Sequence, residues 1–282
     1  QKLYHSVLQA FPKNKRAKKG LHALNATRHS TVTQAVPQEV ISQLINLYNN
    51  GYLEAVVEQA QSLIKQNPTS WLVWNIMGAA GKALGQVDEA FEAFKKVTEL
   101  NPIHAEGFNN LGIILKDQGK LDEAISSYEK AISLKPNFPE AHNNKANILK
   151  SQGKLNKAIS AYSKALSIKP DYAEAFYNMG NVLQEQGKLD ESIASFEKAL
   201  ALKPDYVDAY NNMGNLFKDQ GKLDKAIFAY KKVVSLKPDY AEAHYNIGIA
   251  LSDQGKLDEA VATFKKTLSI KPDYAEAYNN CG

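Results

Sequence analysis

A strict 34-residue period governs this sequence and limits it to a repeated helical fold. Seven glycines and seven prolines each recur at this step. Glycine supplies the left-handed residue that ends a helix, and proline follows a helix end because it cannot continue one. Each period therefore predicts two short helices, about 207–220 and 223–236 in the cleanest copy. The punctuating residues are Gly51, Gly85, Gly119, Gly153, Gly187, Gly221 and Gly255, with Pro68, Pro102, Pro136, Pro170, Pro204, Pro238 and Pro272.

Both helices of a period are apolar on one face, because their apolar residues recur at spacings of three and four. Gly214 lies inside the first helix, where it costs about 1 kcal/mol relative to alanine, so we expect a close helix contact there. Asp171 and Asp239 are each followed three residues later by glutamate, which predicts capping boxes at helix starts. One helix pair cannot bury its own apolar face, so neighbouring copies must stack.

This pattern resembles the tetratricopeptide repeat (TPR) family. An apolar–glycine pair recurs in the first helix, as in Met179-Gly180 and Met213-Gly214, and the second helix repeats an alanine, an aromatic residue and an alanine before proline. The resemblance implies an all-α solenoid of antiparallel helix pairs stacked in a right-handed superhelix, with first helices lining the inner surface. The matching aromatic, alanine and proline residues of one copy are Ala124, Tyr128, Ala131 and Pro136.

The phase of the period defines the organisation of the chain. Residues 1–24 predict a partial repeat with a short helix, and the polar residues up to 36 predict a linker. Seven repeats then span residues 37–274, and residues 275–282 are half of a first helix. We expect a fragment of a longer protein, since terminal repeats normally carry a polar cap. The repeats start at residues 37, 71, 105, 139, 173, 207 and 241.

Composition and charge disfavour several classes of protein. No run approaches the ~18 apolar residues of a membrane span, so we expect no membrane association. The single cysteine, Cys281, allows no internal disulfide and fits a cytoplasmic location. No acid precedes Glu39, and seven basic residues do, whereas the remainder carries 27 basic and 30 acidic residues. The basic run 13–19 contains no aromatic residue, so we expect no nucleic-acid binding.

No pattern of residues predicts an active site. The six histidines are scattered without metal-ligand spacing, and no phosphate-binding loop or dinucleotide fingerprint occurs. We therefore expect no catalysis, no metal and no cofactor. His142 and His244 occupy a packed aromatic position, and the tyrosines before each first helix are expected to pack between repeats.

Amides line the expected inner face. Counting residue 207 as position 1, positions 2, 6, 9 and 13 fall on one helical stripe. An amide offers a donor and an acceptor, which is what an extended backbone presents. The ladder resembles the inner groove of O-linked N-acetylglucosamine transferase, which implies backbone binding. The position-6 residues are Asn110, Asn144, Asn178, Asn212, Asn246 and Asn280, and the position-9 residues are Asn147, Asn181 and Asn215.

The acids beside the ladder favour a neutral or basic ligand. An acid in the last turn of a helix opposes the helix dipole, which calls for a reason other than helix stability. A structural interpretation stands beside this one, in which the asparagines bond the neighbouring repeat, and both roles can coexist. The acids at position 13 are Asp117, Glu185, Asp219 and Asp253.

Three functional interpretations follow from the sequence. The leading one is a non-enzymatic scaffold that binds an extended peptide or protein segment. The second is the substrate-presenting arm of a larger enzyme, such as a glycosyltransferase, whose catalytic domain lies outside this chain. The third is head-to-tail self-association through uncovered apolar helix faces. A carboxylate clamp of the chaperone-binding kind is disfavoured, because position 2 is acidic and position 6 carries amides.

Overall fold

The structure, a computed structural model, describes residues 36–281 and is helical throughout that range. These residues form fifteen helices and no strand, which confirms the all-α prediction. The predicted partial repeat at 1–24 and all but the last residue of the predicted linker lie outside them. The helices are α3 (Gln38–Asn49), α4 (Leu53–Gln66), α5 (Trp71–Ala83), α6 (Val87–Leu100), α7 (Ala105–Asp117), α8 (Leu121–Leu134), α9 (Pro139–Ser151), α10 (Leu155–Ile168), α11 (Ala173–Glu185), α12 (Leu189–Leu202), α13 (Val207–Asp219), α14 (Leu223–Leu236), α15 (Ala241–Asp253), α16 (Leu257–Ile270) and α17 (Ala275–Asn279).

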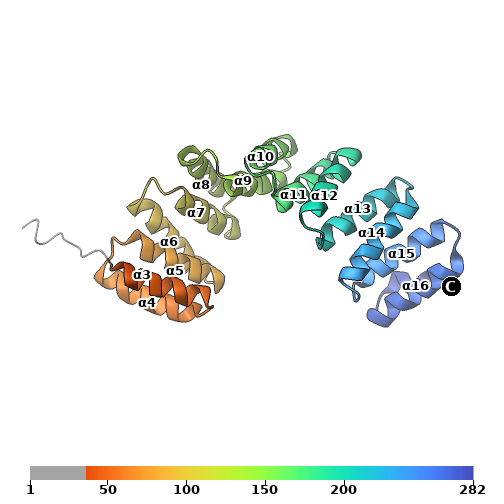
Figure 1. The fold of residues 1–282 in the computed structure, drawn as a ribbon, viewed down its shortest axis with the longest axis horizontal. Helices are drawn as coiled ribbons and strands as arrows, with labels where there is room; N and C mark the ends of the chain where they lie inside the picture. The colour runs from red at the N-terminus through yellow and green to blue at the C-terminus, as the bar shows by residue number, and fades with distance from the viewer. Residues whose placement is uncertain (1–35, 282) are drawn as a thin grey trace, which may run out of the picture. The chain divides into compact units, whose positions relative to one another are not determined.

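Two compact units divide the chain, residues 1–120 and residues 121–282. In the described part of the first unit, α4 packs on α5, α5 on α6 and α6 on α7 (Figure 1). Leu44, Val56 and Val73 are completely buried between the first layers, and Phe94 is buried further along. Each layer covers the apolar face of the previous one, as stacking of incomplete helix pairs requires.

The second unit repeats the same packing from α8 to α17. From α10 to α16, each second helix lies against the first helix of its own repeat and that of the next, as α10 does against α9 and α11. One hydrophobic cluster runs from Ile193 in α12 to Phe264 in α16. A separate cluster joins Leu149 and Tyr162 to Val182 of the next repeat, so neighbouring repeats share each of these cores.

Glycines perform the two jobs that the sequence predicts for them. The seven periodic glycines have φ between 69° and 80°, a left-handed conformation that ends each first helix. Gly214 instead lies under the buried ring of Tyr230, where an added Cβ would be 2.6 Å from the ring. At Gly248 that distance to the ring of Phe264 is 2.5 Å, which confirms the close helix contact.

The predicted capping boxes are wrong. The residues that precede α11 and α15 are Tyr172 and Tyr240, and neither makes a side-chain capping bond. Each helix begins one residue later than a capping box at Asp171 or Asp239 requires. The glutamates at position 2 are therefore free of this role.

The residues before α11, α13, α15 and α17 instead form a lysine–tyrosine pair. The Lys203 ammonium lies 4.8 Å from the ring centroid of Tyr206, and Lys237 lies 5.2 Å from that of Tyr240. A cation over an aromatic face is attracted by the ring quadrupole. This contact gives the recurrent Lys-Pro-Asp-Tyr segment a role beyond the turn itself. The same contact recurs at Lys169 with Tyr172 and at Lys271 with Tyr274.

Candidate peptide-binding face

The first helices of the second unit carry the predicted site residues on one stripe. We call the surface formed by positions 2, 5, 6, 9 and 13 of α9, α11, α13 and α15, with the start of α17, the first-helix face. Its asparagines at position 6 are half-buried in α9, α11 and α13. Asn246 in α15 is only 8% exposed, whereas Asn280 after α17 is exposed. Asn110 belongs to the first unit, so five of the six ladder residues lie in one unit.

Three of the position-6 asparagines, Asn178, Asn212 and Asn280, donate side-chain amide hydrogens to the preceding repeat. Asn212 Nδ2 lies 2.9 Å from Asn181 Oδ1 and 3.3 Å from the Tyr177 hydroxyl oxygen. The amide nitrogen of Asn212 therefore links α13 to α11, as the structural interpretation requires. Equivalent bonds run from Asn178 Nδ2 to Asn143 Oδ1 at 3.4 Å and from Asn280 Nδ2 to the Tyr245 hydroxyl at 3.1 Å.

The side-chain amide oxygens of the same asparagines remain available to accept hydrogen bonds. Within the described residues, Asn178, Asn212 and Asn280 accept no hydrogen bond on Oδ1. None of these oxygens is buried. An amide oxygen has two lone pairs, so each can accept an N–H from outside. The ladder thus presents acceptors, and Asn212, whose two hydrogens are both engaged, has no donor left for a ligand.

The asparagines at position 9 are engaged within the fold. The Tyr162 hydroxyl donates to Asn147 Oδ1 at 2.5 Å, and the Tyr230 hydroxyl donates to Asn215 Oδ1 at 2.7 Å. Burial raises the pKa of both phenols, which therefore remain protonated donors. The ring opposite Asn181 is Phe196, which leaves Asn181 Oδ1 to accept from Asn212 instead. Each of these position-9 amide oxygens therefore already accepts one hydrogen bond within the fold.

Tyrosines add aromatic surface to the first-helix face. The rings of Tyr177 and Tyr206 lie 4.7 Å apart between centroids, and those of Tyr245 and Tyr274 lie 5.0 Å apart. Burial raises the pKa of Tyr206 to about 12, and the nearby Tyr177 and the position-2 acid Glu174 add to the shift. The acids at position 2 therefore lie beside these tyrosines.

The acids at position 13 differ in how far they are neutralised. Lys150 Nζ lies 3.2 Å from Glu185 Oε1, which links α9 to α11 by an ion pair. Asp117, in the first unit, pairs with its sequence neighbour Lys116 at 3.2 Å. Asp219 and Asp253 are exposed and make no ion pair with the described residues. These two carboxylates are the ones available to a cationic ligand group.

A second ladder, which the sequence analysis missed, joins the repeats beside the turn. Gln220 Nε2 donates to Asp190 Oδ1 at 3.3 Å, and Gln254 Nε2 donates to Asp224 Oδ1 at 2.8 Å. The signal was a glutamine before five of the periodic glycines, with a polar residue 30 positions earlier. The same bond joins Gln118 to Asp88, Gln152 to Asp122 and Gln186 to Asn156.

The histidines at position 4 also have a defined structural role. His142 Nε2 lies 3.2 Å from the Pro136 carbonyl oxygen, and His244 Nε2 lies 3.0 Å from that of Pro238. A carbonyl only accepts, so each imidazole donates from Nε2. Trp74 Nε1 makes the same bond to Pro68, which shows a shared constraint on position 4.

The described residues contain neither a metal site nor a membrane span. No three histidine, cysteine or acidic side chains gather there in a way that could hold a metal ion. None of the helices in that range is both long and apolar enough to traverse a lipid bilayer.

Solved structures similar to this chain share the helical repeat architecture. YrrB, described as a TPR protein with an unusual peptide-binding site, aligns at TM-score 0.59 and 25% identity over 67% of this chain and 98% of its own. MamA aligns at TM-score 0.56 and 32% identity over 59% of this chain and 97% of its own. The C-terminal part of a TPR repeat-containing protein from Cytophaga hutchinsonii aligns at 0.70 and 18%, over 86% and 99%, and shows the fold alone.

Family models match the sequence along most of the described repeats. No curated protein matches the chain. A TPR repeat model matches residues 112–150, 146–187, 180–221 and 214–255, which together exceed half of the chain. Tetratricopeptide repeat models also match residues 73–104, 93–126 and 241–274. Proteins with such repeats are generally non-catalytic scaffolds that bind proteins or peptides. The helix pairs, the glycine–ring contacts and these matches show that the chain belongs to the tetratricopeptide repeat family.

Proposed function

We propose that the first-helix face of the second unit binds an extended, neutral to basic peptide segment of a partner protein. The observation that carries this proposal is the row of outward amide oxygens on Asn178, Asn212 and Asn280. Their nitrogens are held by the preceding repeat, which fixes the oxygens without occupying them. Acceptors held in this way suit the backbone N–H groups of an extended chain.

Side chains must supply most of the affinity. Three net hydrogen bonds at roughly 1 kcal/mol each total about 3 kcal/mol, which is weaker than the ~4 kcal/mol of a millimolar complex. Asp219 and Asp253 add negative charge beside the row, and the tyrosine pairs add aromatic surface. Together these groups favour a segment with basic side chains spaced along an extended backbone.

YrrB supports a peptide ligand by resemblance. Its printed description includes a peptide-binding site, and it is 25% identical to this chain over nearly all of its own length. The other interpretations of the sequence remain proposals of lower rank. A substrate-presenting arm of a larger enzyme would use the same face, and head-to-tail self-association would use the ends of the stack.

The test begins with a random twelve-residue peptide library displayed on phage and selected on the purified chain. Fluorescence anisotropy then measures the selected peptide against the wild type and against Asp219→Lys/Asp253→Lys. Affinity should fall at least tenfold. The matched control is Asp239→Lys/Asp273→Lys, which alters net charge equally at exposed turn positions and should change affinity less than twofold.

A backbone test separates the amides from the charges. The selected peptide is remade with alternate backbone nitrogens methylated, which removes N–H donors but keeps every side chain. We expect a further loss of fivefold or more on the wild type. If charge reversal at Asp219 and Asp253 and backbone methylation both leave affinity unchanged, the peptide binds elsewhere and the proposal is wrong.

A further inference from the structure

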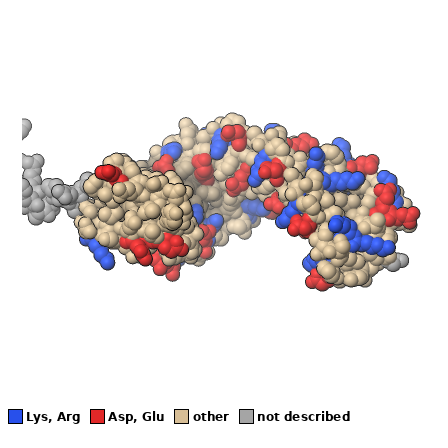
Figure 2. All heavy atoms as spheres, turned by 60° about the horizontal axis from the view of Figure 1, so that its bottom comes forward, with Lys and Arg blue, Asp and Glu red and all other residues tan. Residues whose placement is uncertain are grey.

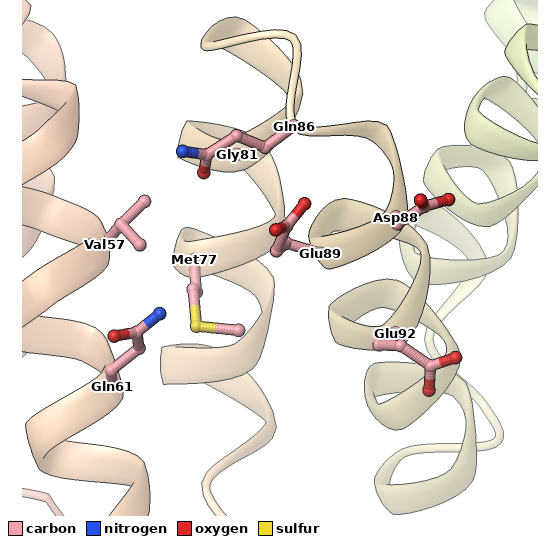
Figure 3. A pocket seen from close by; sticks show the side chains of 8 residues that line it. All are labelled: Val57, Gln61, Met77, Gly81, Gln86, Asp88, Glu89 and Glu92. Carbon is pink, nitrogen blue, oxygen red and sulfur yellow. The ribbon is translucent and has the colours of Figure 1, made fainter.

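A second groove recurs on the side of the array formed by the second helices. It lies between the second helices of consecutive repeats, with positions 7 and 11 of the intervening first helix as its floor; we call it the outer groove. Figure 3 shows residues that line the copy in the first unit: Val57 and Gln61 on α4, Met77 on α5, and the acids Glu89 and Glu92 on α6. That copy has a cavity volume of about 320 Å³, and the copy over Met213 has about 360 Å³.

The copy between α8 and α10 is larger and has a different floor. Its cavity volume is about 860 Å³. Position 7 is Lys145 there, where the other two grooves have methionine, and position 4 is His142. The Lys145 side chain is only 25% exposed and forms an ion pair with Glu129 at 2.6 Å. A charged residue thus replaces a core-type side chain at the centre of this groove.

The walls of this groove carry cations that nothing in the described structure neutralises. The lining holds four lysines and two acids, which leaves a net charge of about +2; Glu129 forms an ion pair with Lys145, and Asp122 accepts a hydrogen bond from the neutral Gln152 amide at 3.1 Å. Lys157 and Lys164 on α10 are exposed and have no ion pair, hydrogen bond or ring contact with the described residues. The repeat 139–172 has six lysines and two acids, although residues 39–282 carry a net negative charge.

The lysines at the same positions of the 207 repeat make ring contacts that Lys157 and Lys164 lack. Lys225 and Lys232 occupy the same repeat positions, 19 and 26, in the 207 repeat. They lie 5.5 Å and 5.6 Å from the ring centroids of Phe217 and Phe228. The residues corresponding to these two rings are Leu149 and Ser160, so the lysines of α10 have no such surface. Figure 2 shows acidic and basic side chains interspersed over the visible face.

His142 also lines this groove. Burial lowers its pKa, the hydrogen bond to the Pro136 carbonyl raises it, and the nearby Lys164 and Lys145 lower it. The floor and the wall carry the same sign of charge.

We propose that this outer groove over Lys145 binds an acidic peptide segment of a partner protein, with two carboxylates against Lys157 and Lys164. These lysines are seven residues apart on α10, or roughly 10.5 Å along the axis. In a polyproline II segment, which has three residues per turn, carboxylates three residues apart lie on one side of the chain and about 9 Å apart. The volume lies within the ~300–1,000 Å³ of ligand sites, and Ile125, Ile132 and Leu149 offer apolar contacts beside the charges. The site is distinct from the first-helix face and does not depend on it.

The probe is a fluorescein-labelled twelve-residue peptide that repeats glutamate, serine and leucine. A second probe replaces every glutamate by glutamine, and a third is a twelve-nucleotide single-stranded RNA of the same label. Anisotropy titrations are run with the whole chain at 50 and 150 mM salt, because exposed charge pairs weaken as salt rises. We expect the glutamate peptide to bind at least tenfold more tightly than the glutamine peptide.

The variants separate this groove from net charge. Lys157→Glu/Lys164→Glu should weaken the glutamate peptide at least tenfold, whereas Lys225→Glu/Lys232→Glu, with the same change in net charge, should weaken it less than twofold. Circular dichroism confirms that both remain helical, and Lys145→Met, which restores the usual floor, should lower affinity about threefold. Equal losses in the two lysine pairs, equal binding of both peptides, or tighter binding of the RNA would each overturn the proposal.

Discussion

Replacing Asn212 measures how much of the asparagine ladder is structural. Asn212→Ala removes the bonds to Asn181 Oδ1 at 2.9 Å and to the Tyr177 hydroxyl at 3.3 Å. The shorter bond contributes about 1 kcal/mol and the longer one about half as much. Alanine recovers up to about 0.7 kcal/mol of helix propensity. The expected net destabilisation is therefore about 1 kcal/mol.

Two companion variants turn this value into a rank order. Asn212→Asp keeps the shape but places a carboxylate oxygen against the Asn181 amide oxygen and gains no propensity, so we expect a loss of about 2 kcal/mol. Asn178→Ala removes a single bond of 3.4 Å, and the propensity of alanine should nearly cancel it. The expected order of destabilisation is Asn212→Asp, then Asn212→Ala, then Asn178→Ala.

Urea unfolding followed by circular dichroism at 222 nm gives the stability of each variant. Repeat arrays unfold by nearest-neighbour steps, so amide hydrogen exchange in α11 and α13 should accompany the melts. The reasoning is refuted if Asn212→Ala is as stable as the wild type, or if Asn178→Ala is the more damaging of the two. Either result would mean that the observed bonds do not hold the repeats together.

Three further predictions concern the core. Tyr230→Phe should cost about 1 kcal/mol in urea denaturation by removing the hydroxyl bond to Asn215, and no loss would exclude a contribution from that bond. Gly248→Ala should destabilise the fold by about 1 kcal/mol, because the added Cβ meets a buried ring at 2.5 Å. Gly81→Ala should instead stabilise it by up to about 1 kcal/mol, because the contacts there are no closer than 3.7 Å. Thermal melts of the two variants measure both effects. Burial lowers the pKa of His142, so protonation below about pH 6.5 favours the unfolded chain and stability should fall as pH drops; urea midpoints of His142→Phe should lose that component of the slope.

The period of the sequence predicted the helices because it depends on local chemistry. Glycine and proline mark the ends, and apolar spacing marks the buried faces, so α13 and α14 agree with prediction to within one residue. Gly214 was correctly interpreted as a close contact for the same reason. These properties need no knowledge of which residues meet across repeats.

The choice of hydrogen-bond partners could not be predicted in this way. Whether Asn215 receives a tyrosine hydroxyl, as it does, or another amide, as Asn181 does, depends on the ring beneath it and on the spacing of adjacent helices. The capping boxes failed because the helix start moved by one residue, which local propensity does not fix. The sequence shows lysine at residue 145, where several other repeats have methionine, but it does not show the groove around that lysine.

The glutamine bridges imply that the array can gain or lose a repeat and still form the same glutamine bond between consecutive repeats. Gln254 bonds to Asp224, a residue of the preceding repeat, and an identical aspartate stands at Asp190 one repeat earlier. If residues 207–240 were deleted, Gln254 would bond to Asp190. Asn246 would take the place of Asn212 beside Asn181 and Tyr177. Duplication of the same block would insert another matching joint. Such a chain can lengthen or shorten by unequal recombination in steps of 34 residues, and each step adds or removes one helix pair together with its glutamine bridge.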